Sequence, residues 1–117
     1  APLVATNTLV RLFQVSLTDA DAELYKCPAL TRVTIIALYK VNIDAGARTF
    51  RIHHVASGGS SGIGNALYYD EPLAAKRVHP RIDSGIILEP GQSIRGVGSV
   101  TNTITLTAFG ILTEEQA

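Results

Sequence analysis

The fold class is decided by the stretch Thr31-Arg32-Val33-Thr34-Ile35-Ile36-Ala37-Leu38-Tyr39-Lys40-Val41. It is rich in β-branched and aromatic residues, which favour strands, and the side chains of a strand alternate between its two faces. The odd-numbered positions from Val33 to Val41 form one expected face, and the even-numbered positions from Thr34 to Lys40 form the other. Both sets are largely apolar, as is typical of a central strand covered on two sides. We therefore predict a central β-strand over residues 31–41.

A second strand is predicted directly after this one. The segment Asn42–Gly46 has the composition of a hairpin loop, in which Gly46 is free to take a positive φ. The chain then returns over residues 48–55, where Phe50 and Ile52 share one face and the other face carries polar side chains. This pattern predicts a half-solvated antiparallel strand paired with the central one.

The rest of the chain follows the same period of two, and Ile, Val and Thr together make up 31 of the 117 residues. Short strands are predicted at 9–17, 86–88, 93–97 and 103–110. Glu89-Pro90-Gly91-Gln92 has the signature of a type II turn, with Pro at the second position and Gly at the third. Single helical turns are expected at 19–24 and 71–76.

These elements predict an all-β fold, a single antiparallel β-sandwich or jelly-roll-like domain of seven or eight short strands. The domain is expected to span residues 1–117, with an extended N-terminal arm at 1–8 and a C-terminal tail at 112–117.

Composition excludes several classes of function. Ten Lys and Arg balance ten Asp and Glu at a pI near 7.1, whereas nucleic-acid binders and amphipathic membrane-surface helices carry a basic excess. No apolar run is long enough to span a membrane, so neither nucleic acid nor membrane is an expected partner. Cys27 is the single cysteine and cannot form an intramolecular disulfide. The start, Ala1-Pro2-Leu3-Val4, lacks the features of a signal peptide, and the sequence leaves localisation open.

The glycine-rich segment Ser57–Gly64 is similar to the cofactor loop of short-chain dehydrogenases. Such a loop needs a following helix whose N-terminus binds the pyrophosphate, but Pro72 interrupts any helix within two turns of Gly64. Only 53 residues follow Gly64, which is too few for a dinucleotide domain. We therefore expect a surface loop and no cofactor.

No metal or catalytic site is expected either. His53 and His54 are adjacent on a predicted strand, so they point to opposite faces, and no ligand set completes a site with His79. No nucleophile motif surrounds the serines of the glycine-rich segment, and Cys27 beside Pro28 is as consistent with burial as with reactivity. We predict that the chain is not an enzyme and that its histidines lie on a strand surface or an interface.

Association is the favoured hypothesis. Leu3 and Val4 lie outside the expected core and are candidate interface residues on an arm, although they could equally pair as an edge strand. Tyr68 and Tyr69 are also candidate interface residues, because large amphipathic rings are enriched where proteins meet. One of these two tyrosines is expected to belong to the core.

The order of segments resembles small β-sandwich virion proteins of tailed bacteriophages, a group that includes capsid decoration (cement) proteins and neck or tail attachments. The segments that carry the resemblance are Leu24-Tyr25, Pro28-Ala29, the 31–41 strand with its loop, the glycine-rich loop, Ala66-Leu67-Tyr68, Pro72-Leu73, Gly85 to Ile94 and a closing Thr-rich strand. The most recognisable piece is the Pro90-Gly91-Gln92 turn before a strand.

This resemblance implies a non-enzymatic structural protein on the outside of a particle, with homo-oligomeric contacts and the major capsid protein or other virion proteins as partners. A decoration role would consist of bridging neighbouring capsid subunits and so stabilising the capsid. The alternative is a neck, tail or fibre module that binds a partner protein or host-surface glycan, for which Tyr68 and Tyr69 would serve as aromatic platforms. A cofactor-binding barrel is a third reading, and it depends on the glycine-rich loop alone.

Overall fold

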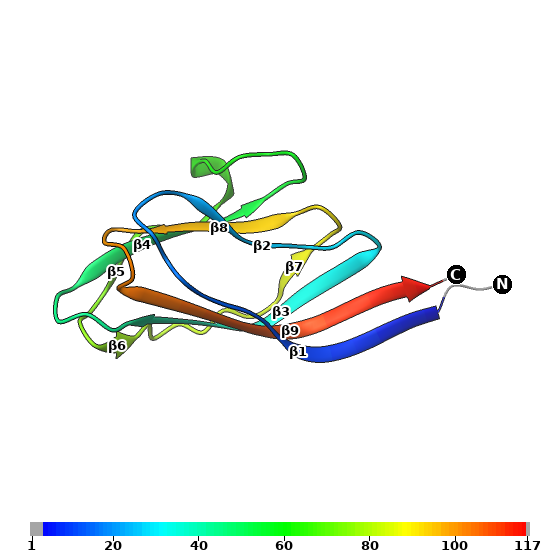
Figure 1. Ribbon diagram of the computed structural model, residues 1–117, viewed down its shortest axis with the longest axis horizontal. Helices are drawn as coiled ribbons and strands as arrows, with labels where there is room; N and C mark the ends of the chain where they lie inside the picture. The colour runs from blue at the N-terminus through cyan, green and yellow to red at the C-terminus, as the bar shows by residue number, and fades with distance from the viewer. Residues whose placement is uncertain (1–3, 117) are drawn as a thin grey trace.

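Two antiparallel sheets pack face to face in the computed structural model, which describes residues 4–116 (Figure 1). The first sheet has the strand order β1-β9-β3-β6, with β7 also paired to β3, and the second has the order β2-β8-β4-β5. The strands are β1 (Val4–Ser16), β2 (Ala22–Lys26), β3 (Thr31–Asn42), β4 (Arg48–Val55), β5 (Ala66–Leu73), β6 (Arg77–Val78), β7 (Ile86–Leu88), β8 (Ser93–Gly98) and β9 (Ile104–Gln116). A single 3₁₀ turn, η1 (Ile63–Asn65), precedes β5. The predicted all-β sandwich is confirmed, with nine strands among the described residues.

The hydrophobic core lies between the sheets and draws on both. Its fully buried side chains come from strands far apart in the sequence, because each strand turns one face inward. They include Leu17, Val33, Ile35, Leu38, Phe50, Ile52, Leu73, Leu88, Ile94, Ile104 and Leu106.

The central strand β3 changes face at a β-bulge. Its pairing with β9 shifts register between Ile35 and Ala37, which leaves Ile36 as the extra residue. Val33 and Ile35 therefore face the core before the bulge, and Leu38 and Lys40 face it afterwards. The predicted strand is confirmed, but the predicted alternation is wrong after Ile36, since one inserted residue exchanges the two faces.

The predicted hairpin between residues 31–41 and 48–55 is wrong. β3 belongs to the first sheet and β4 to the second, so the loop after Asn42 crosses between the sheets. The buried Asn42 side chain holds this crossing: its Nδ2 donates to the carbonyls of Gly46, at 2.9 Å, and Leu73, at 3.1 Å. The local sequence specifies the turn, while long-range pairing decides which sheet each strand joins.

The expected helical turns are largely replaced by strand. Residues 22–26 form β2 against β8, and β5 continues through Leu73 before a turn at residues 75–76. Backbone hydrogen bonds to a neighbouring strand outweigh the weak local preference for one helical turn. The type II turn is confirmed: Gly91 has a φ of 84°, and the Gln92 amide donates to the Glu89 carbonyl at 3.0 Å.

The described parts of the N-terminal arm and the C-terminal tail that the sequence predicts are paired strands in the structure. Residues 4–8 of the expected arm and 112–116 of the expected tail are paired parts of β1 and β9, from Val4 opposite Gln116 onward. Figure 1 shows this end of the first sheet projecting beyond the second, in a molecule 56 Å long. Antiparallel backbone pairing continues through both segments, so residues 4–8 and 112–116 form an extension of the first sheet rather than separate arms.

Candidate functional site

Large apolar side chains are exposed on the outer face of the first sheet. Leu9, Ile36, Ile87 and Phe109 are 71, 40, 50 and 39% exposed, and they lie on the hydrogen-bonded neighbours β1, β3, β7 and β9. We call these four residues the apolar face. Soluble monomers rarely expose clustered side chains of this size, and such clusters are typical of contact surfaces.

Strand register makes the apolar face continuous. Leu9 lies opposite Ile111, Ile111 opposite Thr34, and Thr34 opposite Ile87, which gives one row across four strands. In the row beside it, Phe109 lies opposite the exposed Arg11, and its ring packs edge to face on Tyr39 with centroids 6.1 Å apart. Side chains opposite one another in a sheet touch, so this row forms a connected surface.

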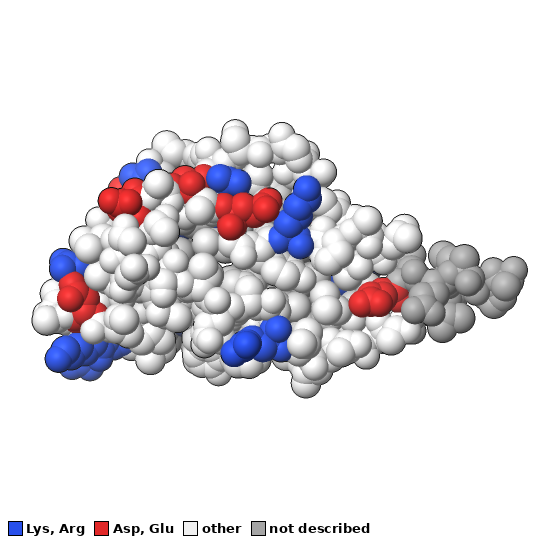
Figure 2. Space-filling view, in the orientation of Figure 1, with Lys and Arg blue, Asp and Glu red and all other residues white. Residues whose placement is uncertain are grey.

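Polar groups border the apolar face on both sides along the strands. On one side Arg32 pairs with Glu89, with the Nε and Oε1 atoms 3.1 Å apart. On the other, Gln14 Nε2 donates to Thr107 Oγ1 at 3.0 Å. An apolar centre with a polar rim is the general layout of protein–protein interfaces. Figure 2 shows, for one side of the molecule, that charged side chains lie in small separate patches, some mixed and some of one sign, on a mostly uncharged surface.

A second feature is a pocket of about 550 Å³ beside the glycine-rich loop, on the outer side of the second sheet. Side chains from β4, β5 and β8 line it, together with Asp21, which directly precedes β2, and loop residues 59–63. The main ones are Asp21, Arg51, His53, Tyr69 and Arg95. Asp21 accepts hydrogen bonds from Ser61 Oγ, at 3.0 Å, and Arg95 Nε, at 2.9 Å. These contacts attach the loop to the sheet.

Tyr69 is exposed in this pocket, but one face of its ring is occupied. The Arg51 guanidinium lies 4.0 Å from the ring centroid and makes two hydrogen bonds to Asp70, at 2.7 and 3.1 Å. The bond from Arg51 lowers the pKa of the Asp70 carboxyl, which keeps this pair ionised. A sugar stacking on Tyr69 would therefore meet only the ring face that Arg51 leaves open.

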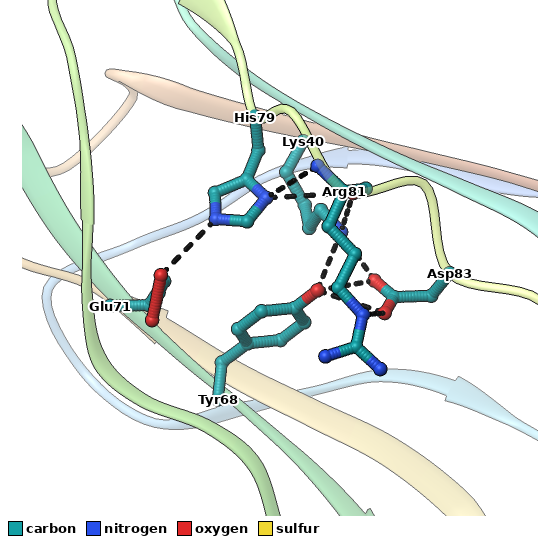
Figure 3. Close-up of polar contacts among 6 residues, drawn as sticks. All are labelled: Lys40, Tyr68, Glu71, His79, Arg81 and Asp83. Carbon is teal, nitrogen blue, oxygen red and sulfur yellow. Dashed lines mark hydrogen bonds and ion pairs between the residues drawn. The ribbon is translucent and has the colours of Figure 1, made fainter.

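Tyr68 is buried, so the expectation that it lies at an interface is corrected, while the expectation of one core tyrosine holds. Its hydroxyl donates to both carboxylate oxygens of Asp83 at 2.8 Å and accepts from Lys40 Nζ at 3.0 Å (Figure 3). Lys40 is fully buried and also donates to the carbonyl of Arg81 at 2.6 Å and to Asp83 Oδ2. All three ammonium protons thus have acceptors, as a buried charge requires.

His79 and Glu71 lie at the edge of this cluster. His79 is buried, with its Nε2 3.3 Å from Glu71 Oε1 and its ring edge-on to Tyr68 at 5.4 Å between centroids. Arg81 is exposed and its Nε lies 3.3 Å from Asp83 Oδ1. We call Lys40, Tyr68, Asp83 and Arg81 the lysine cluster.

Sequence reasoning missed the lysine cluster. Strict alternation places Lys40 on the same face as Thr34, but the bulge at Ile36 turns it into the core. Asp83 belongs to the irregular segment between β6 and β7, and its backbone pairs with Leu38 of β3. A mostly apolar strand containing one lysine was the only signal, and it does not reveal the carboxylate partner.

The other predicted residues are dispersed. Leu3 lies outside the described residues, and Val4 begins the edge strand β1. His53 Nδ1 is 2.9 Å from Asn65 Oδ1, while His54 Nε2 is 2.9 Å from the carbonyl of Ile87 in the other sheet. Cys27 is buried and donates to the carbonyl of Thr31 at 3.1 Å, and its burial raises the thiol pKa.

Two further observations apply to residues 4–116. No helix in this range has the length and apolar character needed to cross a membrane. In the same described part of the chain, no three His, Cys, Asp or Glu side chains lie together as a metal-binding group would require. The end of the glycine-rich loop, including Gly64, forms the 3₁₀ turn η1, and strand β5 follows directly rather than an α-helix.

No protein-family model matches this chain, and no curated protein matches it. Among solved structures it is similar to a chain in the structure of infectious bursal disease virus Gx strain, with a TM-score of 0.46 and 17% sequence identity. The match covers 96% of this chain and 31% of the viral chain, so this chain spans about a third of that protein's length. It is a weak resemblance in architecture to a viral protein and assigns no function.

Proposed function

We propose that this chain is a non-enzymatic virion structural protein that acts through protein–protein contact. More specifically, we propose a decoration protein that binds the outer surface of a capsid and stabilises it, with the major capsid protein as partner. The observation that carries the proposal is the apolar face, Leu9, Ile36, Ile87 and Phe109, on the outside of the first sheet. The resemblance to small β-sandwich virion proteins is the reason for proposing that this contact is made on a virus particle.

Two effects would stabilise such a complex: burial of the apolar face, and the presence of many copies of the same contact on one particle. Removing a contiguous apolar surface from water stabilises a complex by about 25 cal/mol for each Å². The face spans the four neighbouring strands β1, β9, β3 and β7 on the outside of the first sheet, where a partner can approach it. Many symmetric copies add their weak contacts, so each copy needs only a modest interface. Homo-oligomer formation through the same face would use the same chemistry.

The proposal is tested with purified virus particles from the source of this chain. Quantitative mass spectrometry should find a copy number comparable to that of the major capsid protein. A handful of copies for each particle would place the chain in the neck, tail or fibre instead. Absence from particles would refute the virion role altogether.

A pair of variants tests the surface itself. Ile87→Glu places a carboxylate on the apolar face, at the β7 end of the row that begins at Leu9, where burial in an interface would leave it without a partner. We expect it to weaken binding to emptied particles at least tenfold. Ile63→Glu is the matched control, because Ile63 is 78% exposed on the glycine-rich loop, away from the first sheet. Equal binding by both variants would contradict the proposed contact surface.

A second candidate function rests on the pocket beside the glycine-rich loop. Its volume of about 550 Å³, the exposed Tyr69 and the polar groups of Asp21 and His53 suit a small sugar. A fibre module would then bind host-surface glycan through this pocket. Binding to a glycan panel that is lost in Tyr69→Ala would favour this function, and no binding to any glycan at millimolar concentration would refute it.

A further inference from the structure

We propose that Lys40 and Asp83 condense to an intramolecular isopeptide bond, which links strand β3 covalently to the segment between β6 and β7. The inference is independent of the proposed function, because it rests on the interior of the domain. The observation behind it is a primary amine and a carboxylate in direct contact inside the sandwich, with Lys40 fully buried and the Asp83 side chain 11% exposed.

The environment favours the reactive form of the lysine. A lysine must lose its charge to act as a nucleophile, and burial lowers the pKa of Lys40 from its ordinary value. Proton transfer from the ammonium to the adjacent carboxylate gives a neutral amine beside a neutral carboxylic acid. Such a transfer removes both charges from a site where solvation is poor.

The neighbouring groups are placed for the condensation (Figure 3). The Tyr68 hydroxyl touches Lys40 Nζ, at 3.0 Å, and both oxygens of Asp83, at 2.8 Å, so it can pass a proton between them. The Arg81 Nε lies 3.3 Å from Asp83 Oδ1, where negative charge develops in a tetrahedral intermediate. Holding these groups together supplies the orientation that an intermolecular reaction lacks.

The step balances without any other reactant. Lys40 Nζ attacks Asp83 Cγ, the Nζ–Cγ bond forms and Oδ1 carries the negative charge. Tyr68 relays an amine proton to the departing Oδ2, the Cγ–Oδ2 bond breaks and one water leaves. The remaining amide N–H keeps the Arg81 carbonyl as acceptor, and the amide oxygen keeps the Tyr68 hydroxyl as donor. Both polar atoms of the product are therefore satisfied by groups already in place.

The position of the bond has a structural consequence. Residues between β6 and β7 are attached to β3 by a few backbone hydrogen bonds, including Leu38 N to Asp83 O at 3.1 Å and Gly85 N to Ile35 O at 2.9 Å. A covalent link at Lys40 would fasten this irregular edge to the central strand. Unfolding would then have to proceed with a closed loop from residue 40 to residue 83.

The test is the intact mass of the folded, full-length chain under denaturing conditions. We expect a mass about 18 Da below that of the sequence, the loss of one water. Trypsin should release one branched peptide joining residues 33–48 to 82–95, since an acylated Lys40 resists cleavage. Protein that is purified in the unfolded state should have the full calculated mass. After it folds, its mass should fall by about 18 Da. Folded protein that keeps the full mass after a week at room temperature would overturn the proposal.

Variants distinguish the Lys40–Asp83 isopeptide bond from other reactions that remove one water from the chain. Asp83→Ala should carry its full calculated mass, and Lys76→Met, which removes an exposed lysine, should keep the deficit. A deficit that persists in Asp83→Ala would refute the assignment. Tyr68→Phe keeps the buried ring but removes the relay, and we expect the bond to form at least tenfold more slowly. Bond formation at the wild-type rate in this variant would refute the role of the hydroxyl.

Discussion

Removing either partner of the buried Lys40–Asp83 pair should destabilise the domain, but not equally. In Asp83→Ala, the ammonium stays fully buried with only the Arg81 carbonyl and the Tyr68 hydroxyl as partners. An uncompensated buried charge costs about 3–5 kcal/mol. In Lys40→Met, an apolar chain of similar length fills the space, and Asp83 keeps contacts to Tyr68 and Arg81. Relative to a wild-type domain in which the pair has not condensed, we expect a loss of about 1–2 kcal/mol there, the range for a buried group that loses one partner.

The predicted difference of about 2–3 kcal/mol follows from these two ranges. It does not depend on the isopeptide bond, because neither variant can form it. Urea unfolding at pH 7 measures the difference as a shift in midpoint at equal slope. Equal stabilities, or a less stable Lys40→Met, would refute the view that the buried ammonium needs its carboxylate.

The pH dependence gives an independent check on the same pair. Burial lowers the pKa of Lys40 below its ordinary 10.5, and the hydrogen bond to Asp83 opposes that shift. Without Asp83, the folded state binds fewer protons than the unfolded state between its lowered pKa and 10.5. Stability of Asp83→Ala should therefore rise as pH increases from 7 to about 10, whereas that of Lys40→Met should show no rise from this group. A falling or flat profile for Asp83→Ala would contradict the assignment.

The remaining predictions concern packing of the first sheet. Ile35→Asp should abolish cooperative folding, because a carboxylate without a partner would be fully buried at a penalty of several kcal/mol; circular dichroism during heating checks this. A soluble variant with a wild-type melting curve would show that Ile35 is not in the core. Gly110→Ala should lose about 1–3 kcal/mol, since its Cβ would lie 2.2 Å from the carbonyl oxygen of Thr34 and force β3 and β9 apart. Gly64→Ala is the control for the urea midpoint because a Cβ there meets open space, and equal midpoints would contradict the close approach.

Part of the candidate site could be anticipated from local sequence. One of Tyr68 and Tyr69 was expected to belong to the core, and the structure buries Tyr68. The two residues are adjacent on strand β5, so their side chains point to opposite faces and Tyr69 is exposed. The only sequence signal for the apolar face was that both predicted faces of the strand at residues 31–41 are largely apolar. Which residues the face contains depends on the order β1-β9-β3 and on the register of Leu9 with Ile111, neither of which a single strand specifies.

The sequence by itself determined the all-β class, most strand positions and the type II turn at Glu89–Gln92. These features follow from interactions within a few residues: β-branched alternation, proline geometry and a glycine at positive φ. Tertiary structure alone decided that β3 and β4 belong to different sheets and that the bulge at Ile36 turns Lys40 inward. It also brought Lys40 to Asp83, because strand partners are chosen by the burial of whole faces, and that free energy belongs to the assembled sandwich rather than to any segment.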